Sequence, residues 1–300
     1  SNGHIYKKIE DKIKFIDEMK DKHSIRILCK CMGIHHSVYY YHKNHTTNQY
    51  KEENIKLDKE IMEIYAESKR RYGSPKIQRK LENKGIKVSQ KRVARRMKIL
   101  GIRSIVVKKF NYAGNKKVDD TNKINLLEQN FKAEAPKEKW VGDITYIYTK
   151  EIGWTYLAAV MDLYDLKIIG YAYGKHMTAE LVIQALNNAV CTRGIKEGLI
   201  FHSDLGSQYT SNSYEELLKT LNIKHSYSKK GYPYDNASME SFNAILKKEE
   251  VNQKSYVTFE EARLAIFEFI ESWYNNKRIH SSLGYITPNE KERLYYEKIA

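Results

Sequence analysis

The sequence predicts a mixed α/β (α+β) domain preceded by an all-α region that contains a helix-turn-helix. Short helices with clear capping and terminating residues fill the first hundred positions. Three β-rich runs then follow Trp140 in quick succession, and helices alternate with short strands after them. The chain of 300 residues is long enough for two or three domains.

Residues 1–48 are predicted to form an N-terminal helical region with a possible helix-turn-helix. Ile13 and Ile16 belong to an apolar series at helical spacing that extends to about residue 21. Ser24 is placed to cap a second helix, which Gly33 ends, and a third helix follows. A polar linker is expected at about 42–53.

Residues 55–105 are predicted to form a second helix-turn-helix. After a helix over 57–68, Ser74 and Pro75 are expected to begin a helix that Gly85 ends. Ser89 then caps a helix that runs to Leu100. Two short capped helices joined by a tight turn are typical of DNA-binding modules.

Positive charge is concentrated in this region. The formal net charge is +15, and 18 Lys and Arg with one acid, Glu82, lie between Lys69 and Lys117, so this segment holds +17 and the remainder −2. A solvated basic helix face is the alternative, but such faces normally mix both signs. We therefore expect a nucleic-acid partner, contacted by the predicted recognition helix through Lys91, Arg92, Arg95, Arg96 and Lys98.

A polar linker is expected over 106–136, followed by a core over 137–250 and a helical tail over 251–300. Within the core we expect an antiparallel meander of strands, then helices alternating with two short strands. The predicted strands cover 140–148, 155–163, 167–173, 199–203 and 224–228, and the predicted helices cover 178–193, 214–221 and a segment from about 236. Thr258 is placed to cap a long helix to Asn275.

Three acids are the candidate metal ligands. Asp143 interrupts an apolar strand, Asp204 ends another, and Glu240 lies on a helix face with Asn236, Asn243 and Lys247. For each acid taken alone, a surface or capping role is the favoured interpretation. Together, two strand-borne aspartates and a glutamate can hold two Mg²⁺ or Mn²⁺ ions for phosphoryl transfer, since hard oxygen ligands select these metals.

Three segments around these acids resemble the signature blocks of insertion-sequence transposases of the IS3 family, which are similar to retroviral integrases. The segments are Trp140–Tyr146, Phe201–Tyr209 and Tyr234–Phe242. Thirty-five residues separate Asp204 from Glu240, and Lys247 follows Glu240 by seven, as the family pattern requires. The segment from Arg71 to Ile102 resembles the family's helix-turn-helix, and the segment from Tyr274 to Pro288, which includes Arg278, resembles its C-terminal signature.

The resemblance implies a ribonuclease-H-like catalytic core and a transposase that cleaves and joins DNA strands. It implies that Asp143, Asp204 and Glu240 are catalytic and ligate two metal ions. Lys247 is then expected to hold DNA near the metals, with Asn236, Asn243 and Arg278 as further candidate DNA contacts. His202, beside Asp204, is a possible accessory contact to phosphate or a structural histidine.

The expected partners are double-stranded DNA, both transposon ends and target, and a second copy in a dimer or larger synaptic complex. The chain lacks a sustained heptad repeat, so it resembles the second-frame protein of such elements, with the first-frame protein as a possible partner. The apolar stretches are too short to cross a bilayer, so no membrane association is expected. The odd count of three cysteines disfavours a disulfide framework, and both observations favour a cytoplasmic protein. The pair Cys29 and Cys31 lacks the usual zinc-finger spacing.

Two alternatives remain open from the sequence. One is a ribonuclease-H-like, metal-dependent nuclease without strand transfer, which the basic helix-turn-helix disfavours. The other is a DNA-binding regulator with an inactive core, which the complete set of three acids disfavours. A covalent tyrosine recombinase is not favoured, because no Arg and His constellation accompanies the tyrosines.

Overall fold

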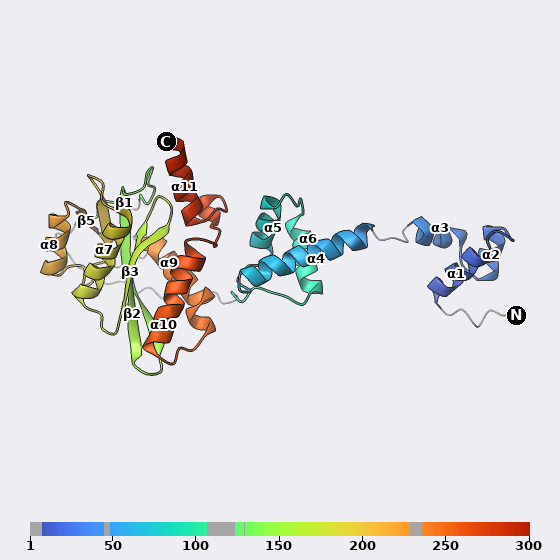
Figure 1. The fold of residues 1–300 in the computed structure, drawn as a ribbon, viewed down its shortest axis with the longest axis horizontal. Helices are drawn as coiled ribbons and strands as arrows, with labels where there is room; N and C mark the ends of the chain where they lie inside the picture. Colours follow the sequence, from blue (N-terminus) through green and yellow to red (C-terminus); the bar gives the residue numbers. More distant parts are fainter. Residues whose placement is uncertain (1–7, 45–48, 107–123, 129, 229–235) are drawn as a thin grey trace. The chain divides into compact units, whose positions relative to one another are not determined.

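The computed structural model describes residues 8–44, 49–106, 124–128, 130–228 and 236–300 (Figure 1). The chain divides into two compact units, Ser1–Glu63 and Ile64–Ala300. The boundary falls inside helix α4, Gln49–Glu67, so the predicted domain at 55–105 contributes residues to both units.

The first unit contains three short helices, α1 (Ile9–Met19), α2 (Ile25–Cys31) and α3 (His36–Asn44). Their buried side chains form a small core of Ile13, Ile16, Leu28, Cys29 and Tyr39. The helix positions agree with the prediction to within one or two residues. Ser24 does precede α2, but its side chain makes no capping hydrogen bond.

Helix α4 is longer than predicted, because the polar residues at 49–53, expected in a linker, are already helical. This segment is rich in Lys and Glu, which have good helix propensity, so its polarity does not prevent helix formation.

The basic helix-turn-helix consists of α5 (Ser74–Asn83) and α6 (Gln90–Ile99). The Ser89 hydroxyl accepts a hydrogen bond from the Arg92 amide at 3.2 Å, which confirms the predicted cap of α6. The predicted cap of α5 is wrong, since the N-cap is Gly73 and Ser74 lies in the first turn. The apolar sides of the two helices are buried through Ile77, Leu81, Val93 and Met97.

A five-stranded mixed sheet forms the centre of the second unit. Its strands are β1 (Lys139–Thr149), β2 (Gly153–Asp162), β3 (Lys167–Gly174), β4 (Ile200–Ser203) and β5 (Lys224–Tyr227). Their order is β3-β2-β1-β4-β5, with antiparallel pairing among β1, β2 and β3 and parallel pairing of β4 with both β1 and β5. The predicted meander and the predicted ribonuclease-H-like architecture are confirmed.

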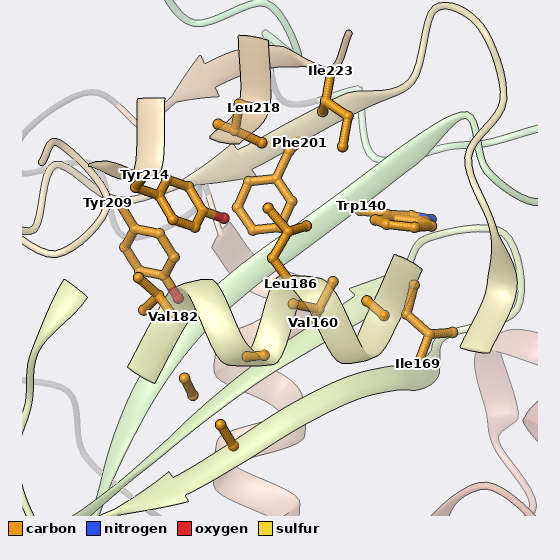
Figure 2. Close-up of a cluster of buried hydrophobic side chains, with 14 of the residues drawn as sticks. Trp140, Val160, Ile169, Val182, Leu186, Phe201, Tyr209, Tyr214, Leu218 and Ile223 are labelled. Atoms are coloured by element: carbon orange, nitrogen blue, oxygen red, sulfur yellow. The ribbon is translucent and has the colours of Figure 1, made fainter. Parts of the chain in front are cut away.

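Helix α7 (Ala179–Arg193) packs on one face of this sheet, where Trp140, Leu186 and Phe201 belong to the main hydrophobic cluster (Figure 2). The approach is very close at Gly170 of β3, where an added Cβ would lie 2.4 Å from the Ala185 carbonyl oxygen. Only glycine allows the helix to lie this near the strand. The remaining helices of the sheet domain before the C-terminal region are α8 (Asn212–Thr220) and α9 (Ala237–Glu249).

The C-terminal region, α10 (Phe259–Phe267) and α11 (Pro288–Ile299) with the turns between them, packs closely on the sheet domain. The long helix predicted from Thr258 instead changes after α10 to a π-helical segment, Glu268–Tyr274. The side chain of Asn275 accepts from the Ile168 amide at 3.0 Å and donates to its carbonyl at 2.9 Å. The predicted tail is therefore bound to strand β3 like a further element of the core.

A buried ion network also joins these parts. Arg193, at the end of α7, pairs with Asp162 at 2.8 Å, Asp165 at 2.7 Å and Glu292 of α11 at 2.9 Å. Asp162 also accepts from the Trp140 indole at 3.1 Å. These contacts give Asp162 a structural role.

Part of the predicted linker is also packed on the sheet. The Leu127 side chain is buried, and its amide donates to the Ser226 hydroxyl. The Tyr227 amide donates to the Ile124 carbonyl at 3.1 Å. Residues 107–123 of the predicted linker lie outside the described residues. Across the described ranges, no helix has the length and apolar character needed to span a membrane.

Candidate active site

Asp143 lies in the middle of β1 with its side chain directed at helix α9. Asn243 of α9 donates a hydrogen bond from Nδ2 to Oδ2 of Asp143 at 2.7 Å. Burial raises the pKa of the Asp143 carboxyl to about 7, and the negative charges of Asp204 and Glu240 add to the rise, whereas the Lys247 ammonium opposes it. The sequence-predicted residues therefore share one electrostatic environment.

The start of α9 is attached to the strand that carries Asp143. Asn236 is buried and donates from Nδ2 to the Gly142 carbonyl at 3.2 Å. Gly142 itself has no room for a side chain, because an added Cβ would lie 2.5 Å from Cζ of Phe201. Phe201 is on β4, two residues before the strand's last residue, so this packing also fixes β4 against β1.

Asp204 follows the last residue of β4 and is exposed. Its Oδ1 accepts a hydrogen bond from the Gly206 amide at 2.9 Å, so the carboxylate is bound to its own turn. Glu240 lies in the first turn of α9, and burial raises the pKa of its carboxyl.

Within the described residues, no three His, Cys, Asp or Glu side chains are arranged closely enough to hold one metal ion. Asp204 and Glu240 are nevertheless near enough to Asp143 for their charges to raise the pKa of its carboxyl. The assignment of the three acids as metal ligands stays a prediction.

Two other residues that were predicted to contact DNA or its phosphates are buried and have polar partners inside the protein. His202 is buried in β4, with Nδ1 2.8 Å from the Ser226 hydroxyl and Nε2 3.0 Å from the Ser228 hydroxyl. These contacts match the structural alternative and do not favour a phosphate contact. Arg278 is buried and pairs with Glu249 at 3.0 Å, so its guanidinium is bound inside the protein. The side-chain amides of Asn236 and Asn243 likewise donate hydrogen bonds to residues of β1.

The basic residues of α6 are largely on its outer side. Lys91, Arg95 and Lys98 are exposed, and Arg92 and Arg96 are half-buried. The opposite side, Val93 and Met97, is buried. The helix therefore presents a basic surface, as the sequence predicted.

Tyr209 was missed by sequence reasoning. Its ring is buried in the main cluster beside Phe201 and Tyr214 (Figure 2). Burial raises the pKa of the Tyr209 hydroxyl well above its usual value, and the charges of Asp143 and Asp204 contribute to that rise. The position of Tyr209 in the segment around Asp204 was the available signal, but the sequence does not distinguish such an aromatic residue from any other residue of the hydrophobic core.

Comparison with known proteins gives matches over nearly the whole chain. Two models described as integrase core domain match residues 133–233 and 221–288, and one described as HTH-like domain matches residues 50–110.

Three curated relatives match over most of their length. The chain is 40% identical to the transposase for insertion sequence element IS904 of Lactococcus lactis, over 79% of this chain and 93% of that protein. It is 37% identical to the IS600 uncharacterized 31 kDa protein of Shigella sonnei, over 91% and 100%. It is 35% identical to the transposase InsF for IS3A of Escherichia coli, over 94% and 98%.

Among solved structures, the catalytic core domain of HTLV-2 integrase in complex with magnesium is 19% identical, with a TM-score of 0.42, and the match covers 54% of this chain and 99% of that one.

Proposed function

Because the chain belongs to the IS3 family of insertion-sequence transposases, we propose that it cleaves and joins DNA strands at insertion-sequence ends with Asp143, Asp204 and Glu240 as the ligands of two Mg²⁺ or Mn²⁺ ions. The observation that carries this assignment is the shared electrostatic environment around Asp143, to which both other acids and Lys247 contribute. Two aspartates, one within a strand and one just after the end of another, together with a glutamate on a helix are suited to phosphoryl transfer.

The chemistry of these side chains fits the proposed metal. All three supply hard carboxylate oxygens, which favour Mg²⁺ and Mn²⁺ over softer metals. Mutual repulsion of the three charges would be relieved by a divalent cation. When bound, the two ions would activate the attacking hydroxyl and stabilise the leaving oxygen.

The neighbouring residues of the chain have positioning roles in this proposal. Asn243 holds Asp143 by a charge-assisted hydrogen bond of 2.7 Å, which fixes the orientation of its carboxylate. Asn236 attaches the start of α9, the helix that carries Glu240, to the strand that carries Asp143. Lys247, seven residues further along α9, would bind a DNA phosphate close to the acids.

DNA ends are proposed to bind the basic surface of α6. Lys91, Arg95 and Lys98 are exposed there and suited to phosphate contacts, whereas Ser89 and the buried apolar side hold the helix in place. Two ends must be handled together, so we also propose a dimer or larger synaptic complex. The first-frame protein of the element is a further proposed partner, and the bacterial cytoplasm is the proposed compartment.

The assignment of the acids is tested by incubating the full chain with labelled element ends and Mg²⁺. We compare wild type with Asp143→Asn, Asp204→Asn and Glu240→Gln, and use Glu216→Gln, on the exposed side of α8, as the control. Each test variant should lose more than about 100-fold in strand cleavage and joining, whereas the control keeps wild-type rates. Retained binding of the ends in a gel-shift assay will show that the variants are folded. Cleavage at wild-type rates in all three variants would disprove the assignment.

A further inference from the structure

The outer half of the β1–β2 hairpin has two very different faces. Thr145, Ile147 and Thr155 are buried on one face. On the other face, paired residues of the two strands place aromatic rings side by side: Tyr146 is opposite Tyr156, and Tyr148 is opposite Trp154. Tyr146, Tyr148 and Trp154 remain 45%, 54% and 59% exposed. Such a concentration of exposed rings on a folded domain usually marks a binding surface.

The rings form a continuous platform and not three separate side chains. The centroids of Tyr148 and Trp154 are 5.4 Å apart, and those of Tyr146 and Tyr156 are also 5.4 Å apart, both in edge-on geometry. Tyr146 and Trp154 are in contact diagonally at 6.4 Å. In each pair the edge of one ring lies against the face of the other, which limits ring motion, and the exposed fractions of Tyr146, Tyr148 and Trp154 show that much of each ring stays accessible to a further flat group.

This platform lines a groove of about 1170 Å³ together with basic residues. Lys247 and Lys248 at the end of α9 and Lys254 in the following segment belong to the same lining, which contains no Asp or Glu among the described residues. Lys254 is paired with Glu250 at 2.7 Å, and polar side chains such as Asn252 and Gln253 also line the groove. The groove is larger than the roughly 300–1,000 Å³ of most small-molecule pockets.

Exposed aromatic rings and lysines in one groove match one class of ligand, a single-stranded nucleic acid. Its bases stack on exposed rings, and its phosphates pair with a basic track. A base inside a duplex has both faces covered by its neighbours and presents only its edges, so the ring platform has nothing to stack on there. We propose that this groove binds a DNA strand whose bases have left the duplex, with the bases stacked on Tyr146, Tyr148 and Trp154.

The groove lies next to the candidate active site along the same two elements. β1 carries Asp143 three residues before Tyr146, and α9 carries both Glu240 and Lys247. A strand held in the groove would thus leave the duplex beside the acids. The inference rests on the proposed function for its ligand, DNA, but its test measures strand binding without metal and without catalysis.

Tryptophan fluorescence provides the measurement. The chain has three tryptophans, of which Trp140 and Trp273 are buried and Trp154 is exposed. The full chain is titrated in EDTA with oligothymidylate of about 12 nucleotides, a length within the usual site sizes of such grooves. We expect quenching of Trp154 emission, and a much smaller effect from an abasic strand with the same phosphates or from a duplex of equal length.

Variants separate stacking from charge. With a labelled oligothymidylate and anisotropy, Trp154→Ala and Tyr148→Ala should each weaken binding about tenfold, whereas Trp154→Phe, which keeps a ring, should restore most of the affinity. Phe267→Ala, an equally exposed ring on α10 outside the groove, is the control and should bind like wild type. Lys248→Ala should lower the salt dependence of binding.

The outcomes distinguish this inference from the proposed function. Unchanged oligothymidylate affinity in Trp154→Ala and Tyr148→Ala, or equal binding of the abasic strand, would overturn the groove assignment whatever the cleavage assay shows. Loss of self-association in these variants, with oligothymidylate binding intact, would also overturn it and identify the platform as a contact between copies of the chain. Quenching that persists in Asp143→Asn supports the groove even where that variant retains strand cleavage and the metal assignment fails.

Discussion

Replacing Asp143 by Asn should stabilise the protein in a pH-dependent manner. Asp143 has a pKa near 7 in the folded protein, compared with an ordinary value of 3.8. A carboxyl whose pKa is raised by folding favours the folded state at low pH, and this contribution is lost as the pH rises towards the folded pKa. Wild type should therefore lose stability between about pH 4 and pH 7 through this one group.

The size of the effect follows from the two pKa values. Their difference corresponds to about 4 kcal/mol for complete ionisation, and about 3 kcal/mol of that lies between pH 5 and pH 8. The Asp143 side chain is only half-buried, so water weakens the effect of burial, and we expect roughly half, about 1.5 kcal/mol. Asn keeps an oxygen that can accept the Asn243 hydrogen bond, so the substitution removes the charge with little change of shape.

The assay is urea unfolding in EDTA at pH 5 and pH 8, followed by tryptophan emission, because Trp140 and Trp273 are buried in the second unit. The stability advantage of Asp143→Asn over wild type should grow between these two pH values, whereas Glu216→Gln should show no such growth. An advantage that is independent of pH would refute the view that burial and neighbouring carboxylates raise the Asp143 pKa.

Three further predictions concern packing, ion pairing and DNA contact. Gly142→Ala should lower the free energy of unfolding by about 1–3 kcal/mol, measured by urea unfolding, since the new Cβ meets the ring of Phe201; unchanged stability would contradict this packing. Arg193→Met should cost about 3–5 kcal/mol in the same assay, because two buried aspartates lose their partner, and a cost near zero would show that the network is not needed. Arg95→Ala with Lys98→Ala should weaken binding of element ends and reduce its salt slope by about one per lost contact; an identical slope would place DNA binding elsewhere.

The elements of the core were predictable because their signals are local. Runs of β-forming residues bounded by turns identified β1, β2 and β3, and Ser89, Thr258 and the glycines marked helix ends. The predictions failed where distant contacts replaced a local rule. Residues 251–300 were predicted to form a separate tail. The Asn275 side chain nevertheless forms hydrogen bonds with both the amide and the carbonyl of Ile168, 107 positions earlier in the chain.

The candidate site divides in the same way. The spacing of Asp143, Asp204 and Glu240 is visible in the sequence, and so is the basic character of α6. The roles of their neighbours are not, because a side chain that is suited to DNA is equally suited to an internal partner. Arg278 and Asn243 were expected to contact DNA, but they bind Glu249 and Asp143 inside the protein.

The sequence by itself determined the order of helices and strands, the location of positive charge and the family to which the chain belongs, since each depends on residue types at short or fixed spacing. Only the tertiary structure decided how Asp143 is held and that four aromatic rings share a groove with lysines of α9. Hydrogen-bond partners and burial depend on segments about a hundred residues apart, and no local pattern records which of them meet.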